Sequence, residues 1–89
     1  MSSVSELAHE VERWADRFDE SQASVRQLLG DLEAAERELA LSLEGSTALN
    51  VRRGAFDISE AQAALALAQA ALASGSANLR RYVRTLLDT

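Results

Sequence analysis

The sequence predicts an all-α protein that folds as an antiparallel hairpin of two long helices. It contains no proline and only four glycines in 89 residues, and it is rich in Ala, Leu, Glu and Arg, as long helices and coiled coils are. Apolar residues recur every seven positions through both halves of the chain, which is the spacing of packed helices. A chain this short, without a cysteine for a disulfide, buries little surface. We therefore expect one domain, residues 1–89, that completes a four-helix bundle by dimerising.

The first helix is expected over residues 3–43. Ser3 is an N-cap candidate, and Glu6 follows three residues later, which is the spacing of a capping box. Two apolar rows then run side by side. The first row is Val4, Val11, Phe18, Val25, Leu32 and Leu39, and the second is Leu7, Trp14, Ser21, Leu28, Ala35 and Ser42. Together the rows predict one stripe along a helix about 60 Å long.

The turn of the hairpin is expected at the segment Leu43-Glu44-Gly45-Ser46-Thr47. Gly45 suits the position just after a helix, and Ser46 or Thr47 can cap the helix that follows. We therefore assign Leu43 and Gly45 to the turn.

The second helix is expected over residues 48–87. Its large apolar row is Val51, Ile58, Leu65, Leu72, Leu79 and Leu86, and its companion row is Gly54, Ala61, Ala68, Gly75 and Tyr82. A large row beside a small one lets two helices approach closely, so Tyr82 is expected to be buried. The register continues across Ser74-Gly75-Ser76, which favours a continuous helix over a break. Between Ala61 and Ala73 the helix is apolar on nearly every side, which predicts burial on several faces.

The charge distribution excludes some classes of function. The net charge is −5, with eleven acidic and four basic residues in 1–44 and three acidic and five basic residues in 45–89. Such a chain lacks the basic patch of a nucleic-acid binder. No window approaches the ~20 apolar residues that span a bilayer, and the N-terminus does not have the pattern of a Sec signal. We expect a protein that stays in the cytoplasm or is secreted without a Sec signal.

Catalysis and metal binding have few candidate residues. One His, no Cys, no Lys and no Gly-rich phosphate loop predict a protein that is not an enzyme and has no cofactor. Glu6 and His9 have the i,i+3 spacing used in di-iron bundles. Both fall off the apolar stripe, so we expect them to be solvated and not to bind metal. A carboxylate site built between subunits is the alternative from the enzyme class.

The expected functional surface is the pair of apolar stripes. The predicted interface residues are Val11, Trp14, Phe18, Val25, Leu28, Leu32, Leu39, Phe56, Ile58, Leu65, Leu67, Leu72, Leu79 and Tyr82. Their partner is a second copy of the chain or a paralogous hairpin, and the sequence leaves both open, as it does a domain-swapped pairing.

This layout resembles the WXG family, the small helical-hairpin proteins exported by type VII secretion systems and often encoded in pairs. Leu43-Glu44-Gly45 stands where the family has its Trp-x-Gly turn, and Ser46-Thr47-Ala48 supplies the small residues that follow. Phe56 matches the aromatic residue early in the second helix. The resemblance covers the whole chain, by architecture more than by identity.

The chain departs from the family pattern in two places. Leu43 replaces the Trp of the turn, and the only Trp is Trp14. The export motif Tyr-x-x-x-Asp/Glu is not met, because Leu86 stands four residues after Tyr82. Family members without that motif act as the silent half of a heterodimer. The resemblance implies a secretion partner, or a targeting adaptor or chaperone for a larger toxin.

A second function class fits the same pattern. The Ala-rich second helix would suit a homo-oligomeric structural or assembly protein that makes repeated contacts in a filament, a shell or a phage particle. Growth beyond a dimer with rising concentration would distinguish this class from a dimeric secretion partner.

Overall fold

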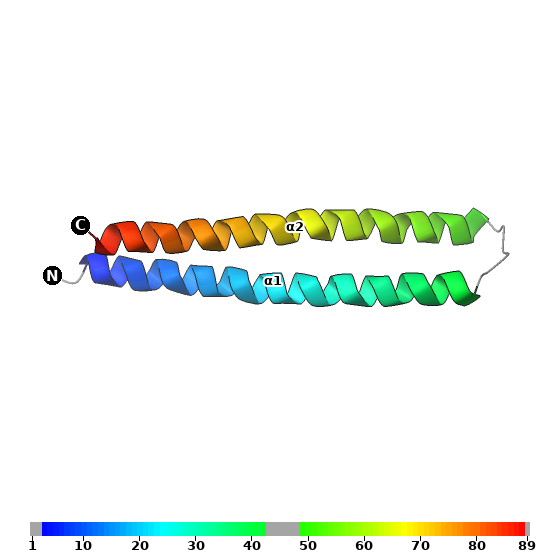
Figure 1. Cartoon of the computed structure of the whole chain (residues 1–89), viewed down its shortest axis with the longest axis horizontal. Helices are drawn as coiled ribbons and strands as arrows, with labels where there is room; N and C mark the ends of the chain where they lie inside the picture. The colour runs from blue at the N-terminus through cyan, green and yellow to red at the C-terminus, as the bar shows by residue number, and fades with distance from the viewer. Residues whose placement is uncertain (1–2, 43–48, 89) are drawn as a thin grey trace.

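The computed structural model describes residues 3–42 and 49–88, and it consists of two helices of nearly equal length. α1 spans Ser3–Ser42 and α2 spans Leu49–Leu87. The helices lie side by side and antiparallel, with both ends of the chain at the same end of the molecule (Figure 1). The described part contains no strand. The predicted all-α hairpin is confirmed, and each observed helix boundary facing the turn lies one residue from the expected 43 and 48.

Local sequence explains why each helix runs unbroken. Glu6 lies in the first turn of α1 and Arg84 in the last turn of α2, where their charges favour the helix dipoles. α2 continues through Ser74-Gly75-Ser76, so the continuous helix favoured by the heptad register is confirmed. The turn assigned to Leu43 and Gly45 lies outside the described residues and stays a prediction.

The hairpin is a single layer two helices wide. It measures 68 × 15 × 14 Å, and its radius of gyration is 19.9 Å, whereas a compact domain of this length has one of about 12 Å. Among the described residues, the hydrophobic side chains that are buried are Ala8, Ala15 and Val83. All three lie in the half of the hairpin that holds the two chain ends. Two helices therefore form a seam and not a globular core.

The accessible surface of the chain also indicates that the hairpin has no globular core. The chain exposes 6632 Å², whereas a compact monomer of 9.6 kDa exposes about 5,100 Å². Neither described helix is long and apolar enough to cross a membrane. The large exposed area makes the surface of the hairpin the place to look for function.

Candidate protein-interaction surface

The seam between α1 and α2 uses two neighbouring rows of each helix. The half-buried large rows are Val11, Phe18, Val25, Leu32 and Leu39 in α1, and Ile58, Leu65, Leu72 and Leu79 in α2. In α1 the second row of the seam contains the buried Ala8 and Ala15, and in α2 it contains the buried Ser76 and Val83. The large heptad rows of both helices thus face each other within one chain.

At Gly75 the two helices approach each other too closely for any larger residue. A Cβ atom built on Gly75 would lie 2.6 Å from Cε2 and 2.9 Å from Cδ2 of Phe18. Real Cβ atoms do not approach carbon atoms so closely, so the Phe18 ring occupies the space that a larger residue would need. The sequence predicts that the small row of α2 approaches the bulky row of α1 closely, and the contact between Gly75 and Phe18 is an example of that approach.

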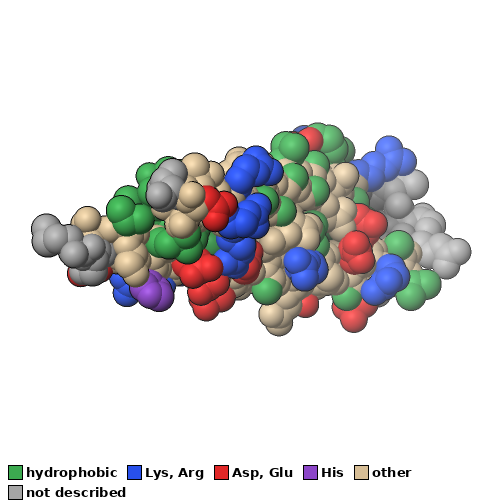
Figure 2. Space-filling view, turned by 60° about the vertical axis from the view of Figure 1, so that its left-hand side comes forward, with side chains coloured by type: hydrophobic (Ala, Val, Ile, Leu, Met, Phe, Trp, Pro, Cys, Tyr) green, Lys and Arg blue, Asp and Glu red, His purple; other side chains and the backbone are tan. Residues whose placement is uncertain are grey.

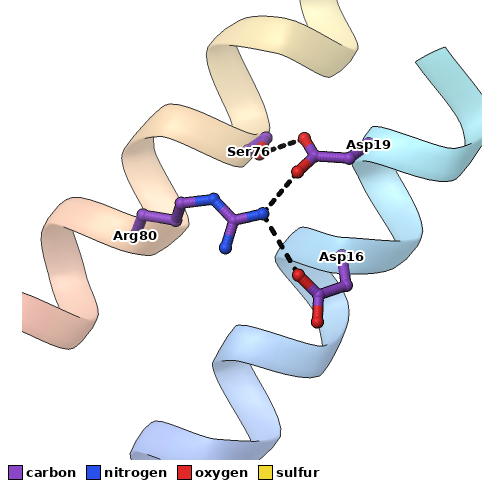
Figure 3. A network of polar contacts seen from close by, with 4 residues as sticks. All are labelled: Asp16, Asp19, Ser76 and Arg80. Carbon is purple, nitrogen blue, oxygen red and sulfur yellow. Dashed lines mark hydrogen bonds and ion pairs between the residues drawn. The ribbon is translucent and has the colours of Figure 1, made fainter. Parts of the chain in front are cut away.

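A polar network closes one side of the seam (Figure 3). Ser76 Oγ donates a hydrogen bond to Asp19 Oδ1 at 2.6 Å. Arg80 Nη2 donates to Asp16 Oδ1 at 3.2 Å and also to Asp19 Oδ2, with which it forms an ion pair. Ser76 is buried, whereas Asp16 and Asp19 face water. The network ties the two helices together near the chain ends.

The network shifts the protonation equilibria of its members. The Ser76 hydroxyl and then the Arg80 guanidinium hold the pKa of Asp19 below its ordinary value, because both donate hydrogen bonds to the charged carboxylate. The same bonds, first from Asp19 and then from Asp16, raise the pKa of Arg80. Both groups are therefore charged at neutral pH, which is the state that the network needs.

The opposite side of the seam is apolar. Asp19 and Arg80 bond to each other on one side of the seam. By helical periodicity, the row of Trp14 in α1 and the row of Tyr82 in α2 therefore lie together on the opposite side of the seam. We call this side the apolar flank. Its members are Leu7, Trp14, Ser21, Leu28 and Ala35 of α1, and Gly54, Ala61, Ala68, Gly75 and Tyr82 of α2. Phe18, which touches Gly75, lies in the seam row next to this flank.

The large side chains of the apolar flank are exposed in the single hairpin. Trp14 is 49% exposed, Leu28 is 50% exposed and Tyr82 is 47% exposed. The expectation that Tyr82 is buried is therefore wrong for the hairpin alone. The rows of α2 that α1 covers are those of Leu79 and of Val83, and the row of Tyr82 lies beside them. Trp14 and Leu28 likewise stay outside the seam. Their membership of an interface with a partner stays a prediction.

Trp14 also borders a small hollow on the outside of α1. The hollow has a volume of about 190 Å³ and is lined by Glu10, Arg13, Trp14 and Arg17. The Arg17 guanidinium carbon lies 4.9 Å from the centroid of the Trp14 ring, within the range of a cation–π contact. The Arg17 guanidinium thus lies over one face of the indole at the edge of the apolar flank, and Trp14 remains half-exposed.

A second exposed apolar area lies on the side of α2 that faces away from α1. Phe56 is 63% exposed and Leu67 is 74% exposed. Exposed alanines surround Leu67, namely Ala63, Ala64, Ala66, Ala70 and Ala71. We call this area the back of α2. Figure 2 shows hydrophobic side chains at the surface among acidic and basic ones. The exposure of Phe56 and Leu67 means that exposed apolar side chains are not confined to the apolar flank.

Groups able to do chemistry are sparse in the described part of the chain. Residues 3–42 and 49–88 contain no cluster of three or more His, Cys, Asp or Glu that could hold a metal ion. Glu6 and His9 are both exposed, as expected from their place off the stripe. His9 lines a shallow hollow with Glu12 and Leu87 at the end that holds the chain termini.

The sequence reading missed the network of Asp16, Asp19, Ser76 and Arg80. The acidic face of the first helix, or a neighbouring protein, was the expected partner of the group Arg80, Arg81 and Arg84, but the individual carboxylates of Asp16 and Asp19 were not identified. A signal was available, since an antiparallel pairing of the two large rows places an acidic flank of α1 beside Arg80. Comparisons with protein-family models, with curated proteins and with solved structures give no match.

Proposed function

We propose that this chain is a non-catalytic protein–protein interaction module whose apolar flank binds a helical partner and completes a four-helix bundle. The observation that carries the proposal is the half-exposure of Trp14, Leu28 and Tyr82 along one side of the hairpin. Large apolar side chains left exposed on one side of a molecule and edged by charged residues are typical of protein interaction sites. Aromatic residues in particular are enriched at the centres of such sites.

The exposed area supports the same proposal. The chain exposes 6632 Å², which exceeds the surface of a compact monomer of its mass by about 1,500 Å². A standard interface buries about 800 Å² on each partner. One partner helix pair seated on the apolar flank would therefore remove much of this excess from water.

In biological terms, we propose a WXG-like secretion partner of a type VII system, or a targeting adaptor for a larger toxin. The two helices of about 40 residues and the aromatic Phe56 early in α2 support this reading. The protein would reside in the cytoplasm or leave the cell without a Sec signal. In a host with an active type VII system, the tagged chain should co-purify with a helical partner, and export of that pair should stop when the system is deleted.

The residue-level test uses two leucines of α1. Leu28 lies on the apolar flank, whereas Leu41 is 77% exposed and lies on the side of α1 that faces away from α2. Leu28→Asp should abolish partner binding, because it places an unpaired charge in a desolvated interface. Leu41→Asp should leave binding within twofold of wild type. Equal binding by both variants would mean that the flank does not contact the partner.

The back of α2 supports one alternative function, a homo-oligomeric structural or assembly protein. Exposed Phe56 and Leu67 would give each hairpin a second contact surface, and two different surfaces on one subunit generate open assemblies. Particle mass that keeps growing with concentration, and that stops growing in Leu67→Asp, would select this function over the discrete bundle.

A further inference from the structure

We infer that the back of α2 pairs with the back of α2 of a second copy, with the two helices antiparallel and a twofold axis passing between Ala70 and Ala71. This surface is separate from the apolar flank. The pairing therefore goes beyond the proposed function and does not depend on which partner covers the flank. The uncharged middle of α2, its seven-residue repeat and the order of its charges each support the pairing.

The middle of α2 has no charge on any side. Residues 61–79 contain no acidic or basic side chain. On the side that faces away from α1, Leu67 is 74% exposed and is surrounded by exposed small residues. These are Ala63, Ala64, Ala70, Ala71, Ser74 and Ala77. Small side chains let a second helix approach closely, so the bulky Leu67 can fit among the small residues of an identical helix.

One row of residues runs along the centre of this side. Its members are seven positions apart and all exposed, namely Arg53, Glu60, Leu67, Ser74, Arg81 and Asp88. We call it the back row. A seven-residue repeat keeps one row of a helix in contact with a neighbouring helix along its length, because the two helices supercoil. The repeat that packs α2 on α1 is therefore also present on the opposite side of α2.

The charged members of the back row complement each other when a second copy runs in the opposite direction. In one register, Glu60 lies level with Arg81 of the second copy. Arg53 lies level with Asp88 of the second copy in the same register. A twofold contact is reciprocal, so each of these pairs forms twice. The acidic and basic residues at both ends of the back row therefore attract each other across the pairing.

The neighbouring residues fit the same register. Leu67 lies level with Ser74 of the second copy, at the uncharged middle of both helices. Beside the back row, Asp57 lies level with Arg84 of the second copy. This contact adds a third pair of opposite charges, so one register brings together the small middle segments and all three pairs.

The acidic residues concerned have no competing ion pair in the hairpin. Among the described residues, the ion pairs are those of Arg80 with Asp16 and Asp19, on the side of the seam. Asp57 and Glu60 are exposed and form no ion pair in that part of the chain. Their carboxylates are therefore available to the arginines of a second copy.

Other arrangements place like charges together. In a parallel pairing each residue of the back row lies level with itself, so Glu60 meets Glu60 and Arg81 meets Arg81. If the antiparallel helices slide by seven residues, either Arg53 meets Arg81 or Glu60 meets Asp88. Like charges placed opposite each other disfavour a pairing. The charges therefore select one direction and one register.

Single cysteines test the direction by disulfide formation. The chain has no native cysteine, and a disulfide requires two Cα atoms within about 7 Å. Ala71→Cys lies beside the twofold axis, so it should form a crosslinked dimer under mild oxidation. Ala64→Cys is also exposed and lies one heptad earlier in the same row. Its two copies would be about 20 Å apart along the axis, at 1.5 Å per residue, so it should form no crosslink.

A mixture of two variants tests the register. Ala64 lies level with Ala77 of the second copy. Ala64→Cys and Ala77→Cys should therefore crosslink to each other when mixed, although neither crosslinks with itself. Only one helix of each copy takes part, so the reactions are run at high protein concentration and in low salt, where ion pairs are least screened. Helicity recorded on each sample checks that the hairpin is folded.

Charge reversal on the Ala71→Cys background tests the ion pairs. Glu60→Arg places an arginine level with Arg81 of the second copy and should lower the yield of crosslink severalfold. Adding Arg81→Glu to that variant restores opposite charges and should recover the yield. Glu20→Arg makes the same change of charge on the side of α1 that faces away from α2, and it should leave the yield unchanged.

The contrary results are equally specific. A crosslink of Ala64→Cys with itself would show a parallel pairing and overturn the inference. Equal crosslinking at all three positions would indicate random collisions, and no crosslink at any of them would show that the backs do not meet; either result would overturn it as well. Each would leave the proposed function intact, because Leu28→Asp tests the apolar flank separately.

Discussion

Of the described glycines Gly30, Gly54 and Gly75, only Gly75 has no room for a side chain. In an exposed helix, replacing Gly with Ala stabilises by roughly 1 kcal/mol. At position 75 the added Cβ would press on the Phe18 ring at 2.6 Å, and overpacking of this kind costs about 1–3 kcal/mol. We therefore expect Gly75→Ala to lower the free energy of unfolding despite its better helix propensity.

Gly30 is the matched control for that substitution. It lies within α1, and a Cβ atom built on it meets nothing within 4 Å. Gly30→Ala should raise the midpoint of denaturant unfolding, whereas Gly75→Ala should lower it. If both variants were stabilised alike, the close approach of Phe18 to Gly75 would be refuted.

Asp19 makes the hairpin sensitive to acid. Its pKa is lowered in the folded chain by Ser76 and Arg80, so its contribution to stability is complete above the ordinary Asp pKa of about 4. The contribution is lost as the pH falls below that value through the folded-state pKa. Wild type should therefore lose more thermal stability between pH 5 and pH 3 than Asp19→Asn does, as measured by circular dichroism melts.

Asp31→Asn is the control for the acid experiment, because Asp31 lies on α1 outside the network. This variant should keep the pH dependence of wild type. A wild-type profile that coincides with that of Asp19→Asn would mean that the Asp19 contacts do not persist in solution.

The sequence predicted where the two helices begin and end, but it did not predict correctly which face of each helix packs against the other. Helix boundaries follow from capping residues, from the absence of proline and from the heptads, and these signals are local. The apolar stripe of α1, however, is three rows wide, since Ala8 and Ala15 extend it beyond the Val11 row on the side opposite Trp14. Periodicity alone cannot decide which two of the three rows α2 covers.

The polar network accounts for the rotation that is observed. With Arg80 bonded to Asp16 and Asp19, α2 lies toward the side of α1 that carries the carboxylates. The row of Trp14 and Leu28 is then left on the far side, half-exposed. This information lies in contacts between residues 57 to 64 positions apart in the sequence, so it can be derived only after the two large heptad rows have been paired antiparallel.

Leu65 and Leu67 test the assignment of the faces of α2. Leu65 is half-buried in the seam, whereas Leu67 is 74% exposed two residues later on the same helix. Leu65→Asp should destabilise by more than about 2 kcal/mol and abolish assembly, because it buries a charge in the seam. Leu67→Asp should change the unfolding free energy by less than about 0.5 kcal/mol.

Chemical denaturation monitored by helicity compares the two variants, with particle mass recorded beside it. A Leu65→Asp protein with wild-type mass and helicity would show that the seam rows are wrongly assigned. A Leu67→Asp protein that fails to fold would show instead that the back of α2 is covered in the assembled protein.

At the scale of the whole molecule, the hairpin is too thin to enclose its own apolar residues. A layer 68 Å long and 14–15 Å across buries few of its large hydrophobic side chains, and the described residues include no large side chain that is completely buried. Small domains of this size usually need a staple or a partner, and the chain has no cysteine. We therefore expect the folded hairpin to depend on a partner that supplies the other half of the core.

The absolute mass of the purified chain, measured by light scattering together with a thermal melt, tests this dependence most directly. We expect a discrete particle of twice 9.6 kDa, with cooperative unfolding whose midpoint rises with protein concentration. A particle of a single chain that unfolds cooperatively at a concentration-independent midpoint would contradict it, because the apolar flank would then need no partner.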